Sequence, residues 1–415
     1  MAGVAQEMRR LARAHHANRA DSLNLGAAET ITSDAVRELL ASDFGRRYST
    51  RSGAYSGAEI GDVIEHMGSE LAKRVFRADF ASLQPISGHV AVLAAVVALT
   101  APGDTVMTTA PEDGGYPLAL APRFGLRVVH HVFDRERQNL DVAATRERML
   151  RERPRLVMFG ASEYLFPHPV GELAEAARAV RALICYDGAH PLGLIAGGAF
   201  HDPLAEGADV LIGSTNKTFF GPHRGLILVR KDEAVFERIL EVVTSPPVLQ
   251  STHHTNTAVA LTVALAEMMA FGNPYASAVV ANARTLAGAL DRRGVPVLAI
   301  GEGGTRSHQV IIPADGYCAP SSVQLQQRLS SAGILADCVV RFGTQQLTRL
   351  GMGPAEMDVV GALIARVYED GGPSTITRVR DEVRDLARAF RTVGYSFDSG
   401  SDAFAYAAIG SAASV

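Results

Sequence analysis

The chain has little of what marks secreted, membrane-spanning or nucleic-acid-binding proteins. It has no tryptophan and three scattered cysteines, Cys185, Cys318 and Cys338, which exclude a disulfide framework or a zinc ribbon. The net charge of -4 gives no electrostatic footprint for nucleic acid or an anionic membrane. No apolar run reaches the roughly 18 residues of a spanning helix, and the N-terminus lacks the apolar core of a secretory signal. We therefore predict a cytoplasmic protein with no nucleic-acid or membrane partner.

Lysine is also scarce, and its scarcity singles out one residue. Only Lys73, Lys217 and Lys231 occur among 40 basic side chains. Lys73 stands among charged helix residues and Lys231 in an Arg-Lys-Asp-Glu turn, both ordinary surface settings. Lys217 is embedded in small and apolar residues, where an amine is costly unless it is used or paired.

The length of 415 residues suggests two domains, one large and one smaller. In the first, apolar runs end at Met107, Phe133, Phe159, Tyr186 and Ile212. Amphipathic stretches separate several of these runs. Because the runs are apolar throughout, they are typical of strands covered on both faces. The pattern predicts an α/β domain with a mostly parallel sheet.

A second pattern follows a predicted helix break at residues 272–274 and indicates a smaller α+β domain. Its expected strands are 297–300, 309–313 and 334–340, and its expected helices are 275–293, 322–331, 354–368 and 377–390. The predicted domains are an N-terminal arm (1–30), a large domain (31–272), a small C-terminal domain (273–395) and a flexible tail (396–415). In the first part, helices are expected over 34–42, 59–75, 90–99, 142–151, 173–181 and 257–269.

Polar side chains stand just beyond the ends of three of the predicted strands. Ser162 follows the strand ending at Phe159, Asp187 follows Tyr186, and 214–217 (STNK) follow the next strand. Any one of them could be a satisfied turn or cap residue. Since ligands bind beyond the carboxyl ends of such strands, together they predict a site with a carboxylate, an amine and hydroxyls.

A further segment has the features of a phosphate site. Residues 84–89 (QPISGH) precede an apolar helical run. Free amides at a helix start, a serine hydroxyl and a glycine that permits close approach can hold an anion. An aspartate and a lysine thirty residues apart complete what pyridoxal phosphate needs: Lys217 to form an imine, Asp187 to keep the ring nitrogen protonated.

Five ordered motifs carry a resemblance to a known family. They are 27–33 (AAETITS), 84–88 (QPISG), 186–190 (YDGAH), 214–222 (STNKTFFGP) and 341–344 (RFGT). The chain resembles the serine hydroxymethyltransferase branch of the fold-type-I, pyridoxal-phosphate-dependent enzymes. This resemblance implies a large domain of the aspartate aminotransferase type, a small α+β C-terminal domain and a homodimer with shared active sites.

The resemblance also implies roles for individual residues. The implied catalytic residues are Lys217, Asp187, His190 and Tyr55. The implied cofactor-binding residues are Ser87, Gly88, His89, Tyr116, Ser162, Asp187, His190, Ser214, Lys217, Ser251 and Thr252. Arg341, Glu29 and Tyr55 would bind the substrate, with Arg341 on its α-carboxylate. Tyr55, Ser251 and Thr252 would act across the dimer interface, and no metal is expected.

Two departures from the family's pattern concern folate. The family's Tyr-Ala-Glu-Gly loop is Tyr48-Ser49-Thr50-Arg51-Ser52 here, and no carboxylate occurs between Asp43 and Glu59. Only the short stretch 337–340 stands before Arg341 where the family has a long loop that helps hold folate. These departures predict an enzyme that works without folate.

Three hypotheses follow for the function. The first is an enzyme of antibiotic metabolism that resembles the pyridoxal-phosphate enzymes of lincosamide pathways. It would act through an external aldimine and a quinonoid on a cysteine S-conjugate, by C–S β-elimination or decarboxylation-coupled oxidative deamination. The alternative is a hydroxymethyltransferase, threonine-type aldolase or transaldolase on a β-hydroxy amino acid, with Thr50, Tyr55 or His190 replacing the missing glutamate. The third is a binding or scaffold protein that has lost catalysis.

Overall fold

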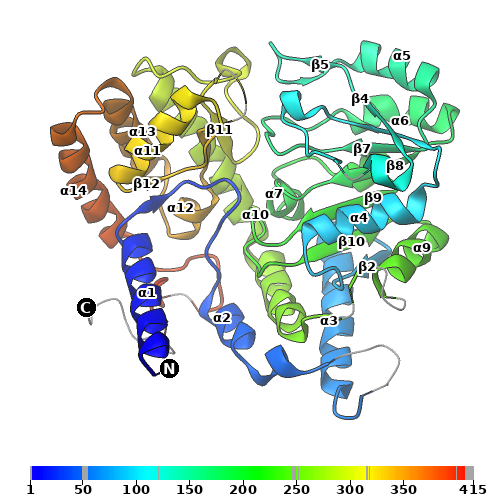
Figure 1. Cartoon of the computed structure of the whole chain (residues 1–415), viewed down its shortest axis with the longest axis horizontal. Helices are drawn as coiled ribbons and strands as arrows, with labels where there is room; N and C mark the ends of the chain where they lie inside the picture. The colour runs from blue at the N-terminus through cyan, green and yellow to red at the C-terminus, as the bar shows by residue number, and fades with distance from the viewer. Residues whose placement is uncertain are drawn as a thin grey trace. The chain divides into compact units, whose positions relative to one another are not determined.

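The computed structural model divides the chain into two compact units, shown in Figure 1. The larger unit comprises residues 35–277, and the smaller one comprises 1–34 together with 278–415. Residues 1–34, which include the predicted arm, thus group with the C-terminal part of the chain. The described residues are 2–48, 55–119, 121–244, 249–250, 252–314, 316, 318–398 and 400–406.

A seven-stranded sheet forms the centre of the larger unit, in the order β2-β10-β9-β8-β7-β3-β4. Neighbouring strands from β9 to β4 are parallel, while β10 is antiparallel to both of its neighbours. The strands are β2 (Phe80–Ser82), β3 (Thr105–Thr108), β4 (Arg127–His130), β7 (Leu156–Phe159), β8 (Leu183–Asp187), β9 (Val210–Ser214) and β10 (Gly225–Val229). The predicted α/β fold with a mostly parallel sheet is confirmed.

One predicted strand is divided differently in the structure. The apolar run expected to end at Phe133 gives β4, which ends three residues earlier, and then a separate hairpin. That hairpin pairs β5 (Phe133–Asp134) with β6 (Asn139–Leu140) outside the main sheet. Asp134 ends the apolar run, because its carboxylate accepts hydrogen bonds from the amides of Glu136 and Arg137 in the hairpin turn.

Helices pack on the sheet through small and aliphatic side chains. Helix α4 (Gly88–Leu99) contacts β9, β10 and α9 (Glu233–Thr244), and Figure 1 shows α4 and α9 against the same part of the sheet. Ala91 and Ala95 of α4 share one buried cluster with Ile212 and Ile227 of the strands. The other helical segments of this unit are α2 (Asp34–Leu40), η1 (Asp43–Arg46), α3 (Glu59–Phe76), η2 (Pro111–Asp113), η3 (Ala121–Phe124), α5 (Val142–Glu152), α6 (Val170–Ala179), α7 (Leu192–Ala196) and α8 (Pro203–Glu206).

The predicted helix break at residues 272–274 is wrong. Helix α10 (Thr255–Asp291) runs through it with Pro274 inside. Side-chain contacts hold this part of the helix in place: Asn273 Nδ2 donates to the Gly197 carbonyl at 3.0 Å, and the buried Tyr275 hydroxyl donates to the Thr218 carbonyl at 3.0 Å. These contacts offset the loss of one helical hydrogen bond at proline.

Helix α10 also corrects the expectation that no segment is apolar enough to span a membrane. By length and composition the helix passes that test, but 61% of its apolar window is buried inside the protein. It is therefore a core helix, in which apolar side chains pack against the rest of the chain.

The smaller unit combines short strand pairs with helices. Strand β1 (Leu23–Asn24) is parallel to β12 (Ile334–Leu335), and β11 (Gln309–Ile311) is antiparallel to β13 (Arg341–Gly343). Its helical segments are α1 (Ala2–Ala20), η4 (Ile300–Glu302), α11 (Pro320–Ser331), α12 (Gln345–Arg349), α13 (Pro354–Glu369) and α14 (Pro373–Ala389), with the last part of α10. Leu23, Leu286, Val310, Phe342 and Val360 belong to its core.

Two strands predicted for this unit differ in the structure. Residues 297–300 form no strand, although the Leu298 amide donates to the Ile311 carbonyl at 2.9 Å. The strand expected over 334–340 stops at Leu335, because residues 337–340 form a tight turn in which the Val340 amide donates to the Asp337 carbonyl.

The cysteines and the C-terminus also differ from expectation. Cys318 and Cys338 are joined in a disulfide with Cα atoms 4.9 Å apart, while Cys185 is free and buried. The predicted flexible tail begins at residue 396, yet Ala403 and Phe404 are buried in a small apolar cluster. Residues 407–415 lie outside the described residues.

A buried histidine predicts acid sensitivity. His131 stacks on Phe159, and burial lowers its pKa from 6.5 to about 4. The unfolded chain therefore binds more protons below pH 6.5, so stability falls as the pH falls from 6.5 toward 4. We expect a loss of about 2 kcal/mol between pH 7 and pH 5.

The measurement is the melting temperature at both pH values for the wild type, His131→Gln and the control His66→Gln, whose histidine is exposed. The His131 variant should lose less of its melting temperature on acidification than the other two proteins. Equal losses in all three would contradict the prediction.

Candidate functional site

The carboxyl ends of three neighbouring parallel strands lie at one edge of the sheet. These are β7, β8 and β9, which carry Ser162, Asp187 and Ser214 at or just beyond their ends. Gly160, at a φ of 113°, lies so close to Asp187 that a Cβ there would be 2.3 Å from the Asp187 carbonyl oxygen. Only glycine therefore permits this approach between β7 and β8.

Asp187 is a half-buried residue with polar partners. Its Oδ1 accepts a hydrogen bond from the Ala189 amide at 2.9 Å. Burial raises the pKa of Asp187, while the Ala189 amide and the positive charges of Lys217 and His89 act in the opposite direction. The structure therefore brings Lys217 and His89 close enough to Asp187 for their charges to act on its carboxylate.

Lys217 lies on a compact loop after β9. Thr215 closes the loop: its hydroxyl donates to the Pro222 carbonyl at 2.6 Å, and its carbonyl accepts from the Gly221 amide at 2.7 Å. Lys217 is half-buried there. The next residue, Thr218, donates its hydroxyl proton to the carbonyl of buried His190, which ties the loop to the segment after β8.

The predicted phosphate turn precedes helix α4 as expected. Ser87 is the N-cap, and its hydroxyl accepts from the Val90 amide at 3.2 Å. Gly88 lies against the end of β9: a Cβ there would be 2.0 Å from Ser214 Oγ and 3.2 Å from Ser214 Cα. The free amides of an apolar helix therefore begin beside the strand that leads to Lys217, an arrangement that suits an anion.

This close approach gives a prediction. Gly88→Ala should weaken binding of pyridoxal phosphate at least ~10-fold, because the new methyl group must displace Ser214 or the start of α4. The control is Gly171→Ala, where the nearest atom to the new Cβ lies 3.8 Å away. Equilibrium titration of the two apoproteins measures the effect, and equal affinities would contradict it.

His89 and Tyr116 form a polar aromatic pair near Asp187. The Tyr116 hydroxyl lies 2.9 Å from His89 Nδ1. Burial and the charge of Asp187 raise the pKa of Tyr116. The Ser162 amide donates to the Gly114 carbonyl at 2.7 Å, so the segment that carries Tyr116 is fixed to the end of β7. The predicted residues of four separate segments are thus brought together.

Arg224 was not singled out by the sequence analysis. It is fully buried, and its guanidinium donates to carbonyl oxygens before the phosphate turn and at the start of α10. The acceptors are Leu83, Gln84, His253, His254 and the Thr257 hydroxyl. An arginine directly before an apolar strand was the available signal, since burying it requires several partners.

Gln250 was also missed. Its side chain accepts from the Ile86 amide at 3.2 Å and donates to the Gln84 carbonyl at 2.8 Å. This links the segment before Thr252 to the phosphate turn. Thr252 itself is half-buried, and Ser251 lies outside the described residues.

The structure does not bring Tyr55 to this cluster within one chain. Tyr55 is 48% exposed and stacks on Tyr48, with ring centroids 4.9 Å apart. Among the described residues it makes no other ring contact, hydrogen bond or ion pair. Residues 49–52 of the loop that departs from the family's pattern lie outside the described residues, Thr50 included.

Arg341 and Glu29 lie in the smaller unit, on segments that pair with each other. Gly26 forms a β-bridge with Phe342, and the Gly343 amide donates to the Leu25 carbonyl at 2.7 Å. The exposed Glu29 carboxylate is engaged by Arg19 at 2.6 Å and by Asn24 at 3.0 Å. Arg341 is paired with Asp337.

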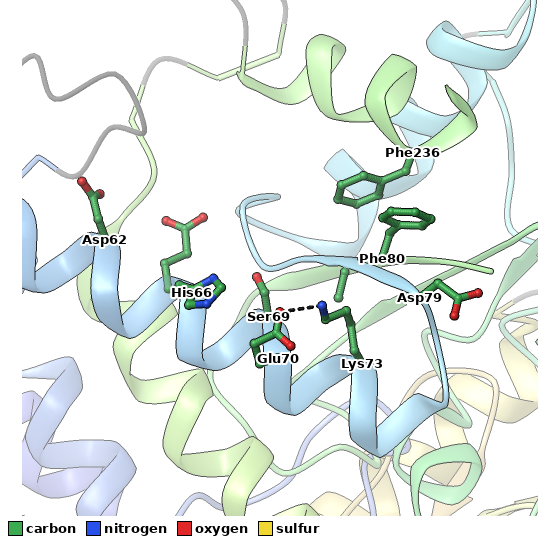
Figure 2. Close-up of a pocket in the computed structure, with 10 residues that line it drawn as sticks. Asp62, His66, Ser69, Glu70, Lys73, Asp79, Phe80 and Phe236 are labelled. Carbon is green, nitrogen blue, oxygen red and sulfur yellow. Dashed lines mark ion pairs between the residues drawn. The ribbon is translucent and has the colours of Figure 1, made fainter. Parts of the chain in front are cut away.

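A cavity of about 480 Å³ lies beside α3. Figure 2 shows Glu70 and Lys73 as an ion pair on α3 and the rings of Phe80 and Phe236 stacked at one end. None of its lining residues is a predicted site residue. Its lining consists of Asp62, Glu65, His66, Ser69, Glu70, Lys73, Asp79, Phe80, Ala81 and Phe236.

The cluster at the sheet edge has the donor set that pyridoxal phosphate requires. Gly88 and the α4 amides offer a cradle that a Cβ would fill, burial raises the pKa of the half-buried Asp187, and Lys217 follows the adjacent strand. The fold and this donor set define a pyridoxal-phosphate-dependent enzyme of fold type I.

Comparisons with known proteins identify the family. The serine hydroxymethyltransferase family model matches residues 1–316. The chain is 41% identical to serine hydroxymethyltransferase of Methanocaldococcus jannaschii, over 93% of this chain and 94% of that protein. It is 39% identical to the Methanothermobacter thermautotrophicus enzyme, over 97% of each. The chain belongs to the serine hydroxymethyltransferase family.

A solved structure agrees with this assignment. L-threonine transaldolase from Pseudomonas fluorescens superposes with a TM-score of 0.87 at 28% identity, covering 96% of each chain. The predictions of a serine hydroxymethyltransferase-like enzyme and of pyridoxal phosphate as its cofactor are confirmed. The comparisons give no support to a lincosamide-like branch or to cysteine S-conjugate chemistry.

Proposed function

We propose that this enzyme breaks and forms the Cα–Cβ bond of a β-hydroxy-α-amino acid, as an aldolase, transaldolase or hydroxymethyltransferase. The observation that carries the proposal is the similarity over nearly the whole chain to serine hydroxymethyltransferases and to an L-threonine transaldolase. Both names describe group transfer from a β-hydroxy amino acid. The alternative hypothesis of the sequence analysis is thus better supported than cysteine S-conjugate cleavage.

The proposed chemistry uses the cluster at the sheet edge. Bound pyridoxal phosphate supplies an electron sink for the pair released when a bond to Cα breaks. Lys217 would hold the aldehyde carbon, and Asp187 would hold the proton on the ring nitrogen. The α4 amides with Ser87, Gly88 and His89 would hold the phosphate, supported by the N-cap geometry. Further cofactor contacts are proposed for Tyr116, Ser162, His190, Ser214, Ser251 and Thr252.

Substrate contacts are proposed for three further residues. Arg341 would bind the α-carboxylate through paired N–H groups, which suit a planar carboxylate. Glu29 and Tyr55 would contact the rest of the substrate. Removing the proton from the β-hydroxyl would fall to His190 or Tyr55, since the chain has no carboxylate between Asp43 and Glu59.

We also propose that the reaction proceeds without folate. The structure leaves only residues 336–340 between β12 and Arg341, which supports the absence of a folate-holding loop. A cytoplasmic location and a role in antibiotic metabolism stay predictions.

The experiment measures aldehyde release from L-threonine and 3-phenylserine, with and without tetrahydrofolate, using Lys217→Ala as the blank. Aldehyde release that does not depend on tetrahydrofolate is the expected result. Serine turnover that requires tetrahydrofolate would overturn the folate-independent part. Absence of aldehyde from every β-hydroxy amino acid, with pyruvate released from a cysteine S-conjugate, would overturn the whole proposal.

A homodimer with shared sites is proposed as the working form. Ile60, Val63 and Met67 form an exposed apolar stripe on α3, directly after the segment that carries Tyr55. Such a stripe supports an interface because isolated exposed helices rarely align large apolar side chains. A mixture of the inactive variants Lys217→Ala and Tyr55→Ala should regain activity if each site takes Tyr55 from the partner. No recovery in a mixture shown to exchange subunits would contradict this.

A further inference from the structure

We propose that Asp337 is a positioning residue that holds the Arg341 guanidinium in the orientation needed to bind the substrate carboxylate. This inference deepens the proposed function and rests on the role proposed there for Arg341. It concerns the affinity for one chemical group, the carboxylate, and leaves the bond-breaking step to other residues.

The contacts between the two residues define the orientation. Asp337 Oδ2 accepts from Arg341 Nε at 2.9 Å and lies 2.9 Å from Nη2, while Oδ1 accepts from the Arg341 backbone amide at 3.0 Å. One edge of the planar guanidinium is therefore fixed by Asp337. A guanidinium has a second edge, between Nη1 and Nη2, that can also hold a carboxylate by two parallel hydrogen bonds.

Burial makes this contact stronger than a surface ion pair. The Arg341 side chain is 11% exposed and that of Asp337 29% exposed. Hydrogen bonds between opposite charges gain strength as water is excluded. An arginine side chain also loses rotamer freedom when a ligand binds, and a preset orientation removes part of that cost.

The backbone around Asp337 is held in an unusual conformation. Val340, directly before Arg341, has a φ of 52° although it is β-branched, which is unfavourable for such a residue. The Val340 amide donates to the Asp337 carbonyl, the Val340 side chain is buried, and Cys338 is bonded to Cys318. Strain persists only where the surroundings enforce it, so this turn keeps Asp337 facing Arg341.

The test compares two ligands that differ only in the carboxylate. Serine and ethanolamine are titrated calorimetrically into the holoenzyme, without reductant, for the wild type, Asp337→Ala and Asp337→Asn. Asp337→Ala should raise the dissociation constant of serine by ~10-fold and leave that of ethanolamine unchanged. Asp337→Asn should lie in between, because its amide oxygen can still accept from the Arg341 amide. In turnover, KM should rise while kcat stays within about twofold.

The matched control is Asp358→Asn, since Asp358 pairs with Arg292 and Arg293 on the surface of the same unit. It should change neither constant. The inference would be overturned if the Asp337 variants bound serine and ethanolamine equally more weakly, or if both variants had the wild-type dissociation constant for serine.

The variant Arg341→Gln distinguishes a failure of this inference from a failure of the proposed function. If Arg341→Gln weakens the binding of serine and Asp337→Ala does not, only the positioning role of Asp337 is overturned. If Arg341→Gln leaves serine binding unchanged, the proposed carboxylate site fails and the role of Asp337 fails with it. If the inference is correct, the double variant Asp337→Ala/Arg341→Gln should bind serine no more weakly than Arg341→Gln alone.

Discussion

Replacement of Lys217 by alanine is expected to lower turnover by ~10³-fold or more. It should also remove the borohydride-sensitive visible absorption of the purified holoenzyme. The reason is that no other amine lies on the loop after β9, whose geometry Thr215 fixes by two hydrogen bonds. The fold should be retained, because the loop is closed by backbone and threonine contacts that do not involve the lysine side chain.

Because the chain has only three lysines, the lysine that binds the cofactor can be assigned unambiguously. Lys73 and Lys231 are the only other lysines, so the double variant Lys73→Arg/Lys231→Arg has Lys217 alone. That protein should keep its activity and its absorption band, and borohydride reduction should attach the cofactor to the single lysine-containing peptide. Normal absorption in Lys217→Ala, or labelling at Lys73 or Lys231, would refute the assignment.

Asp187→Asn is expected to lower kcat by ~10²-fold or more, because an amide cannot hold a proton on the ring nitrogen as a carboxylate does. It should not unfold the protein. Burial raises the pKa of Asp187, so the folded state binds a proton more tightly than the unfolded chain does. Keeping the carboxylate charged at neutral pH therefore costs stability, and this cost vanishes as the pH falls and the group is protonated.

The variant apoprotein should accordingly melt at or above the wild-type temperature at pH 7, while its holoenzyme is nearly inactive. Asp209→Asn is the matched control: burial also raises the pKa of Asp209, and its Oδ2 accepts from the Ile184 amide at 2.7 Å. Asp209 precedes β9 and so lies at the opposite end of the strands from Lys217. Full activity in Asp187→Asn, or an equal loss in Asp209→Asn, would contradict the role of Asp187.

Local patterns predicted the sheet and the residues at its edge well. Strands β7, β8 and β9 are mostly apolar, with polar residues at or just beyond their ends, so the burial of the strands and the position of the proposed site could be predicted. The start of α4 was predictable because Ser87 and Gly88 stand directly before an apolar run.

Elements that depend on distant contacts were not predictable in the same way. A Gly-Asn-Pro sequence usually ends a helix. Helix α10 continues through it because Asn273 and Tyr275 contact residues far away in the chain. The strand expected up to Val340 ends early for a local reason, the turn in which the Val340 amide donates to the Asp337 carbonyl and the Asp337 carboxylate binds the Arg341 amide and side chain. The identity of a residue alone does not show which distant carbonyl or side chain will satisfy it.

The sequence by itself determined the cofactor class and the α/β fold and predicted the roles of Lys217 and Asp187, because these depend on residue type and on order along neighbouring segments. The tertiary structure alone decided that Arg224 and Gln250 join the predicted phosphate turn to the segment before α10. Buried polar groups must find partners wherever the folded chain supplies them, and those partners are set by packing across long stretches of sequence.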